Sequence, residues 1–245
     1  MKKDPLLDPF QLRHLTLRNR IMSTAHAPSY EEDGHPRDRY RLYHEEKAKG
    51  GIGLTIIGGS TNIAPDSPSV FGQLYAGDNS IIPWFQKLTN GVRSHGAVVM
   101  CQITHMGRRT AWDDGHWLPV LGPSGSRERA HRSFPKAMET EDINRVIAQF
   151  ASAAKRCQQG GFDGIELLSH SHLLGQFLSP LVNTRQDDYG GSLDNRLRLT
   201  LQVIEAVRES VGPEMILGLR ITGDEQVKGG LDGAECVEIA RKIGY

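Results

Sequence analysis

The stretch 161–196 reads GFDGIELLSHSHLLGQFLSPLVNTRQDDYGGSLDNR, and the rest of the chain is interpreted around it. Residues 162–168 follow a Gly-Gly helix stop and end in an apolar run without sustained alternation, which is typical of a strand covered on both faces. His170 and His172 come directly after this run. Because α/β folds place their chemistry in the loops that follow buried parallel strands, the pair is the first candidate site, with an ordinary loop as the alternative.

The composition fits one α/β domain that binds small molecules. The chain has 245 residues and 38% hydrophobic content, enough to bury a core. It carries 29 basic and 29 acidic residues, a balance that favours neither nucleic acid nor an anionic membrane as partner. Small neutral or zwitterionic ligands fit better.

Cysteine usage and the first residues indicate a cytoplasmic protein. Cys101, Cys157 and Cys236 are scattered singly and odd in number, so they suggest neither a disulfide framework nor a zinc site. We therefore expect a reducing compartment. The opening Met-Lys-Lys is followed by Asp4 and Pro5 rather than an apolar run, and no window approaches ~18 apolar residues, which argues against an export signal or a membrane span.

Strands and helices alternate along the chain, and this alternation predicts a parallel sheet. Strands are expected at residues 20–25, 54–58, 98–103, 162–168 and 215–221. Helices are expected over 37–49 and 82–94, after Thr140 as N-cap, after Ser192 as N-cap, and from Asp232 in a capping box to the last residues.

The connections favour a barrel that is only partly present. Helix-to-strand connections are short and built on glycine, whereas strand-to-helix connections are long, the extreme being 104–139. Long loops at one end of a parallel sheet build a pocket there, as in a (β/α)₈ barrel. Five units are counted where a closed barrel needs eight, so we expect an N-terminal fragment; a complete open five-stranded sheet is the alternative.

A family resemblance appears in residues 172–196, HLLGQFLSPLVNTRQDDYGGSLDNR. This run resembles the fourth strand-loop of the FMN-dependent Old Yellow Enzyme family, whose members carry a similar YLLNQFL-P-N-R-D-YGGS-NR run. The resemblance implies an α/β fold of the (β/α)₈ TIM-barrel type, with residues 1–245 forming about the first five units of an FMN-binding oxidoreductase domain.

The first strand resembles the family at residues 19–27, NRIMSTAHA, which are similar to NRI-x-x-x-P-M-T. The resemblance implies that the backbone of Thr24, Ala25 and His26 approaches the flavin ring. Ala27 stands where many members place a Thr or Cys beside a flavin carbonyl. That departure removes a side-chain hydrogen bond that tunes the flavin potential.

The resemblance also assigns cofactor contacts at three further strand ends. Gly58 and Gly59 match small residues that let the ring lie against backbone. Gln102 lies in QITHMGRR, which is similar to Q-x-x-H-x-G-R, and its carboxamide offers a donor and an acceptor to the pyrimidine edge of the flavin. Arg220 lies in GLRIT, similar to GLRLS, and is implied to stabilise the anionic reduced ring.

The substrate side departs from the ene-reductase pattern. The family's His-x-x-Asn or His-x-x-His anchors a substrate carbonyl and is followed by a proton-donating Tyr. Here Leu167 and His170 stand at the anchor positions and His172 at the Tyr position. By the same resemblance, His105 and Arg108 belong to the active-site wall.

The His-x-His pair, together with the STAHA and GGSTNIAP runs, looks more like the amine-oxidising branch that includes trimethylamine dehydrogenase and the dimethylglycine and N-methylproline demethylases. In that chemistry an N-methyl carbon gives hydride to flavin and the iminium is hydrolysed to formaldehyde. An imidazole with a pKa near ~6.5 would hold the amine unprotonated. Tyr30, with Trp112 and Trp117, is a candidate ammonium-binding cage.

Other functions stay open. An NAD(P)H-dependent reductase of activated alkenes, as in dienoyl-CoA reductase, is the alternative among oxidoreductases. A metal-dependent hydrolase using His170 and His172, or a non-catalytic piece, are alternatives of other classes. Larger family members add a 4Fe-4S cluster and an FAD or NAD(P)H domain, and the flavin phosphate binds after strands seven and eight. The electron partner and assembly into a homo-oligomer are left open by the sequence.

Overall fold

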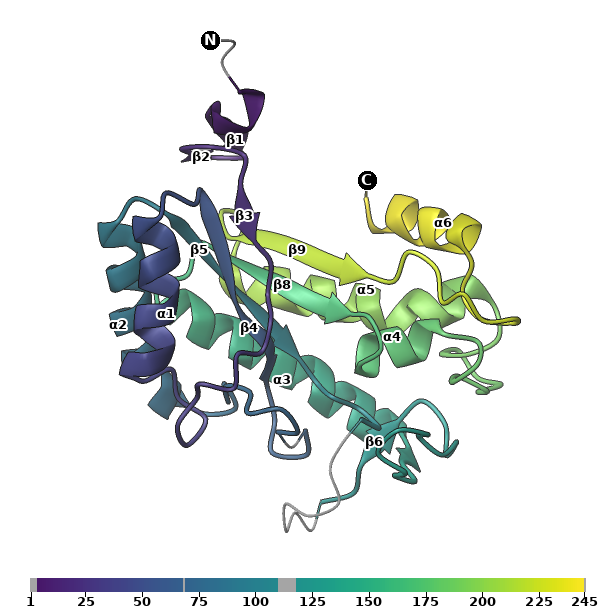
Figure 1. The fold of residues 1–245 in the computed structure, drawn as a ribbon. Coiled ribbons are helices and arrows are strands. Elements are labelled where there is room, and N and C mark those ends of the chain that lie inside the picture. Colours follow the sequence, from purple (N-terminus) through teal and green to yellow (C-terminus); the bar gives the residue numbers. More distant parts are fainter. Residues whose placement is uncertain (1–3, 68, 110–117, 245) are drawn as a thin grey trace.

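The structure is a computed structural model, and it describes residues 4–67, 69–109 and 118–244. Its main sheet is parallel, with strand order β3-β4-β5-β8-β9, so strands that follow one another along the chain are also neighbours (Figure 1). The strands are Met22–Ser23, Leu54–Asn62, Val98–Thr104, Gly164–Ser169 and Ile216–Ile221. This is the order of consecutive units in a (β/α) barrel, as the sequence predicted.

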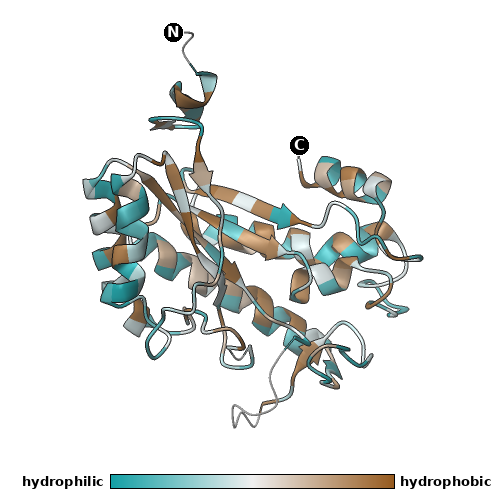
Figure 2. Cartoon of the chain, in the orientation of Figure 1, coloured by the Kyte–Doolittle hydropathy of each residue, from teal (hydrophilic) through white to brown (hydrophobic). Residues whose placement is uncertain are grey.

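Helices cover one face of this sheet. Figure 1 shows α1, α2, α3 and α5 along the same side of the strands, with α4 and α6 beyond the strand ends. Their bounds are Asp38–Lys49, Ile82–Ser94, Thr140–Gln159, Leu193–Val211, Leu173–Leu178 and Gly233–Ile243. Short 3₁₀ helices, η1 and η2, lie at Pro5–Leu7 and Asn79–Ile81. Figure 2 shows apolar strands at the centre and polar residues over much of the outer helices, the pattern expected of a helix-covered sheet.

Alternation along the strands divides them between two cores. Cys101 and Ile165 point to the helices and join the large core. Met100 and Ile216 point to the opposite face, where a small apolar cluster also contains Leu17. Leu17 comes from β2 (Leu15–Leu17), which pairs antiparallel with β1 (Phe10–Leu12). This hairpin therefore covers the amino-terminal end of the inner face and leaves the carboxyl ends of the strands for polar groups.

Several details differ from the sequence prediction. β4 runs to Asn62 rather than ending at Gly58, because a register shift lets it continue beside β5. The N-cap of α3 is Glu139 rather than Thr140, since Glu139 and Asp142 form a reciprocal capping box. Helix α4 and the short strands β6 (Leu121–Gly122) and β7 (Lys136–Ala137) were not predicted. In the part of the chain that the structure describes, no helix is long and apolar enough to cross a membrane.

Candidate functional site

A polar row crosses three neighbouring strands on the inner face. Gln102 of β5 lies opposite Glu166 of β8, and the Gln102 Nε2 donates to Glu166 Oε1 at 2.6 Å. From β9, Arg220 donates its Nε to the same oxygen at 3.0 Å and Nη2 to Oε2 at 3.3 Å. These residues follow the apolar inner positions Met100 and Ile216 toward the strand ends. The arrangement joins the two predicted cofactor residues, Gln102 and Arg220, through a carboxylate that is only 8% exposed.

The bulge in β4 completes the wall beside this row. Gly58, Gly59 and Ser60 have φ of 107°, 53° and 84°, a left-handed run that favours glycine. The N–H of Ser60 donates to Gln102 Oε1 at 2.9 Å, which fixes the orientation of the amide. A Cβ on Gly59 would lie 1.9 Å from the carbonyl carbon of His26. The two glycines thus bring the segment after β3 against β4.

The segment after β3 holds the other predicted cofactor residues, Thr24, Ala25 and His26. The His26 ring bonds through Nδ1 to the Thr24 carbonyl at 3.1 Å and through Nε2 to the Tyr43 hydroxyl at 2.8 Å. Lys47 Nζ lies 3.4 Å from the same Nε2. His26 therefore points its side chain toward helix α1, and the segment can meet a ligand through its backbone, as the sequence resemblance implied.

His170 and His172 lie just beyond the end of β8 but in different surroundings. His170 is exposed, with Nδ1 3.4 Å from Thr222 Oγ1. His172 is 4% exposed, and its Nδ1 lies 3.0 Å from Thr104 Oγ1. The same hydroxyl lies 3.4 Å from the His105 carbonyl; in the tautomer in which it donates there, it accepts from Nδ1–H and the lone pair of His172 is on Nε2.

The surroundings lower the pKa of both imidazoles, exposed His170 included, and lower it most for buried His172. Burial, followed by the nearby charge of Arg109, lowers the pKa of His172 to about 3. The pKa of His170 is lowered by burial and then by Arg109 and Arg220, against a smaller opposing effect of Glu225. Both pKa values therefore lie below the ~6.5 expected from the sequence, and that of His172 lies so far below it that the ring is neutral at neutral pH.

His105 faces away from any ligand, contrary to the expectation that it lines the substrate wall. Its side chain is fully buried, its Nδ1 accepts from the Gly107 N–H at 3.0 Å, and its Nε2 lies 3.3 Å from Asp66 Oδ1. Asp66 in turn binds Arg145 of α3. Both ring nitrogens are thus used inside the protein, and His105 ties the loop after β5 to helix α3.

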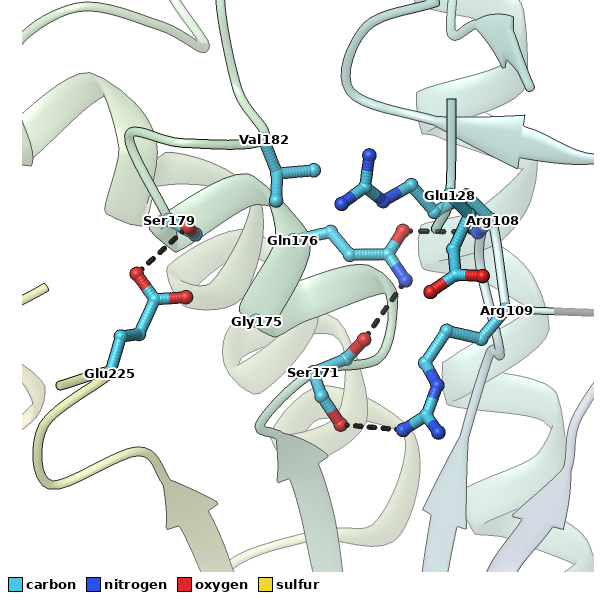
Figure 3. Close-up of a pocket in the computed structure, with 9 residues that line it drawn as sticks. All are labelled: Arg108, Arg109, Glu128, Ser171, Gly175, Gln176, Ser179, Val182 and Glu225. Carbon is cyan, nitrogen blue, oxygen red and sulfur yellow. Dashed lines mark hydrogen bonds between the residues drawn. The ribbon is translucent and has the colours of Figure 1, made fainter. Parts of the chain in front are cut away.

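Arg108 and Arg109 line a cavity of about 240 Å³ between the loops that follow β5, β8 and β9 (Figure 3). Arg108 Nη1 donates to the backbone oxygen of Ser126 at 3.0 Å and to its Oγ at 2.9 Å. Arg109 Nη1 donates to Ser171 Oγ at 3.1 Å. The structure therefore brings the predicted Arg108 to a cavity, together with an arginine that the sequence did not single out.

Tyr30 lies at the opposite side of the site, beside α1. The guanidinium carbon of Arg39 is 4.0 Å from the centre of the Tyr30 ring, and the Tyr43 ring meets it edge to face with centroids 5.6 Å apart. One aromatic face is therefore already used by a protein cation. The other members of the expected cage, Trp112 and Trp117, lie outside the described residues.

The polar row fits the pyrimidine edge and reduced-state charge of a flavin. Gln102 donates one amide hydrogen to Glu166 and accepts one hydrogen bond from the Ser60 N–H, so one amide hydrogen and one lone pair remain for a ligand. For Arg220, Nη1 has no partner among the residues described, and the side chain is 33% exposed. In the same described ranges no group of three or more His, Cys, Asp or Glu is arranged to hold a metal ion, so the metal-hydrolase alternative gains no support.

Glu166 is the main site residue that the sequence analysis missed. It sits within the apolar-looking run of β8, where a charged residue is rarely buried without partners. Two-residue spacing places it on the same face as Gly164, opposite Ile165 and Leu167. A buried glutamate at an inward position of a strand was the signal available in the sequence.

Comparisons with known proteins agree with this geometry. A profile of the NADH:flavin oxidoreductase / NADH oxidase family matches residues 5–244. A probable N-methylproline demethylase of Rhizobium meliloti (strain 1021) is 53% identical over 99% of this chain and 36% of its own length. An N,N-dimethylglycine/sarcosine dehydrogenase of Chromohalobacter salexigens is 49% identical over 98% of this chain and 35% of its own length.

Two further matches extend the range of activities. A multifunctional alkene reductase/demethylase OYE of Caballeronia cordobensis is 48% identical over 89% of this chain and 32% of its own length. The chain thus spans about a third of the length of these three relatives. Among solved structures, a complex of 2-naphthoyl-CoA reductase superposes with a TM-score of 0.90 at 26% identity, over 98% of this chain and 38% of the other. The predicted barrel fold and the family resemblance are confirmed.

Proposed function

Because the chain belongs to the NADH:flavin oxidoreductase / NADH oxidase family, we propose that it forms the flavin-facing part of an enzyme that oxidises small N-methylated amines. The relatives named as an N-methylproline demethylase and an N,N-dimethylglycine/sarcosine dehydrogenase support this choice, since each is about half identical over nearly the whole chain. The observation that carries it is the position of His170 and His172 just beyond the end of β8, with His170 beside Thr222 at the end of β9, the strand that holds Arg220.

FMN is the cofactor that these residues fit. Gln102 would meet its pyrimidine edge, Arg220 would face the charge that develops on reduction, and Gly58 and Gly59 would keep side chains out of the way. Bound FMN supplies a two-electron acceptor: hydride leaves an N-methyl carbon, and the resulting iminium takes up water and splits into formaldehyde and the demethylated amine, with release of a proton.

The two histidines would bind the amine while their imidazole rings remain uncharged. The Nε2 lone pair of His172 would accept a hydrogen bond from the N–H of the ammonium form as the substrate arrives, since a neutral tertiary amine has no N–H, and burial prevents the ring from becoming a second cation. Arg109 and Arg220 both act electrostatically on His170, so this part of the site is rich in positive charge. Such surroundings destabilise an ammonium ion and favour the neutral amine, the form from which hydride can leave.

The inward face of β8 offers no group to polarise a carbonyl at its end. Leu167 packs in the helix-side core, and the next residue, Leu168, takes the position beside Arg220 in the sheet. An enone reductase needs a hydrogen-bond donor for its substrate carbonyl. The strand therefore favours amine oxidation over enone reduction.

Anaerobic reduction of flavin in the full-length protein tests the proposal. N-methylproline, N,N-dimethylglycine and trimethylamine are each mixed with the oxidised enzyme, and flavin bleaching and formaldehyde are measured together. We expect at least one of these amines to bleach the flavin with one formaldehyde per flavin, and no bleaching by proline or glycine, which lack the N-methyl group. Bleaching by NADH without any response to the amines would overturn the proposal.

Reduction of an activated alkene is the second candidate, because the relative from Caballeronia cordobensis is named as both an alkene reductase and a demethylase. The same preparation separates the two activities. Enzyme reduced with NADH is mixed anaerobically with an enone, and rapid reoxidation of the flavin would assign the reductase activity. Slow reoxidation, together with rapid bleaching by amines, would leave amine oxidation as the function.

A further inference from the structure

The cavity next to the His170–His172 segment contains a guanidinium that has no acidic partner among the residues the structure describes. Arg109 is half-buried, donates one hydrogen bond to Ser171 Oγ, and has no carboxylate within 4.0 Å in the described ranges. A guanidinium carries five N–H donors in a planar fork that matches a carboxylate. Figure 3 shows the side chain extending along the cavity toward Ser171, to which it donates its hydrogen bond.

The acidic residues of the same cavity are engaged by other groups. Glu128 accepts from the backbone N–H and ring Nδ1 of His131. Glu225 Oε2 accepts from Ser179 Oγ at 2.9 Å and from the Leu231 N–H at 2.8 Å. Each carboxylate thus holds its own loop together. Neither forms an ion pair with Arg109, so an anionic group from outside the chain would not have to displace one.

The second arginine of the cavity, Arg108, forms its hydrogen bonds with backbone carbonyls and a hydroxyl group. Arg108 Nη1 binds the carbonyls of Ser126 and Arg127 and the hydroxyl of Ser126. Arg108 therefore shapes the loop, whereas Arg109 is engaged by no carboxylate of the described residues.

Arg109 is also close to the two imidazoles. Its hydrogen-bond partner, Ser171, is the residue between His170 and His172 and has a left-handed backbone with φ of 53°. That conformation turns the hydroxyl of Ser171 to Arg109 while the neighbouring residues carry the imidazoles. An anion bound by Arg109 would therefore lie next to the segment that carries both imidazoles, on which Arg109 acts electrostatically.

We propose that Arg109 binds a carboxylate of the substrate, so that the amines accepted by this site are N-methylated amino acids rather than simple alkylamines. This inference rests on the proposed function and adds to it the group that selects the substrate. Ser171 is the positioning residue, because its hydroxyl fixes one edge of the guanidinium.

Binding of unreactive ligands to the oxidised full-length holoenzyme tests the role of Arg109 apart from turnover. L-Proline carries the carboxylate and pyrrolidine lacks it, and the dissociation constant of each is read from the flavin absorbance. For Arg109→Gln we expect proline to bind about 30-fold more weakly or worse, with pyrrolidine changed less than about threefold. Arg109→Lys should recover part of the affinity, since it keeps the charge but loses the planar fork.

The control is Arg129→Gln, which removes an exposed arginine from the same loop and should change neither constant. Equal flavin content in all variants reports intact folding, and Arg109→Lys decides the matter if Arg109→Gln fails to fold. Unchanged proline affinity in the Arg109 variants would overturn the inference. A second outcome would also overturn it: Arg109→Gln loses affinity for NADPH but not for NADH, relative to the native enzyme, and its affinity for proline is unchanged. That result would assign the guanidinium to a nucleotide phosphate.

Failure of the proposed function has a different signature. If no N-methylated amine bleaches the flavin, amine oxidation is wrong, yet the ratio of proline to pyrrolidine affinity still shows whether Arg109 is a carboxylate site. If the amines bleach the flavin, and Arg109→Gln is bleached by N,N-dimethylglycine and by trimethylamine at the same rates as the native enzyme, only the role of Arg109 is wrong.

Discussion

Gln102 and Glu166 are joined by a hydrogen bond of 2.6 Å from the amide Nε2 to the carboxylate Oε1. The same oxygen accepts from Arg220 Nε at 3.0 Å. Glu166 therefore does two things at once: it orients the amide, and it compensates part of the guanidinium charge. The electrostatic field that a flavin would meet at this edge depends on the pair Glu166–Arg220 and not on Arg220 alone.

Replacing Glu166 by glutamine should raise the reduction potential of bound FMN. The substitution keeps the side-chain volume but leaves the Arg220 charge uncompensated, which stabilises the anionic reduced ring. We expect the midpoint potential, measured by spectroelectrochemistry of the full-length protein, to rise by about 30 mV or more, since 30 mV corresponds to about 1.4 kcal/mol for a two-electron couple. Glu209→Gln on the exposed side of α5 is the control. An unchanged or lower potential would contradict this role of Glu166.

Gly59→Ala should be far more damaging than Gly51→Ala. Both glycines have positive φ, of 53° and 97°, so both substitutions carry a backbone penalty, about 1 kcal/mol at Gly59 and no less at Gly51, whose φ lies outside the left-handed helical region. Only at Gly59 does the new Cβ collide with backbone, 1.9 Å from His26 C, whereas nothing lies within 4 Å at Gly51. We expect lower flavin content for Gly59→Ala alone, and a much larger fall in melting temperature for Gly59→Ala than for Gly51→Ala. Equal losses in the two variants would show that the close approach at the β4 bulge is unimportant.

Much of the fold could be predicted because glycine stops and apolar runs mark the units along the chain. Ser192 caps α5 and Asp232 caps α6 through the side-chain bonds that their spacing implied. The register shift in β4 and the hairpin under the barrel could not be foreseen. They depend on which inner-face residues meet, a property of the assembled sheet rather than of any local pattern.

The site was predictable where a residue's neighbours lie on adjacent strands. Gln102 and Arg220 meet because parallel strands end at one edge of the sheet. His105 was wrongly predicted to line the site, because nothing in the local sequence indicates that its Nε2 bonds to Asp66, 39 residues earlier. The pKa of His172 was misjudged for a related reason: burial under a loop is a tertiary property, and motif spacing does not report it.

Asp66→Asn should destabilise the protein without reaching the flavin. Burial raises the pKa of Asp66, but hydrogen bonds from His105 and Arg145 outweigh it and bring the pKa to about 2. Asparagine removes the charge from a buried pair, at a cost of about 2 kcal/mol or more, discounted because Arg145 is partly exposed. We expect a lower melting temperature and an unchanged flavin potential. Asp194→Asn, at an exposed surface pair, should alter neither, and a shifted potential in Asp66→Asn would place His105 nearer the flavin than the structure does.

Two buried histidines should make the protein sensitive to mild acid. His44 is fully buried, with Nδ1 3.0 Å from Thr55 Oγ1 and no hydrogen-bond partner for Nε2 among the described residues. Burial, then the charges of Lys47 and His26, lower its pKa to about 3, and the pKa of His172 is lowered to a similar value. The unfolded chain, with pKa near ~6.5, therefore binds more protons between pH 6.5 and 3, and the free energy of unfolding falls as the pH falls through that window.

Each of these two rings contributes up to about 1.4 kcal/mol of destabilisation per pH unit below ~6.5, or about 2 kcal/mol at pH 5. His44→Gln keeps a polar group beside Thr55 but cannot take up a proton, so its melting temperature should fall less between pH 7.5 and 5 than that of the native protein. His14→Gln, which removes an exposed ring, should fall as much as the native protein does. A histidine that stays neutral in the folded protein lowers the free energy of unfolding at every pH at which the unfolded chain would protonate it. If His44→Gln and the native protein lose equal stability between pH 7.5 and 5, His44 is therefore not a source of the acid sensitivity.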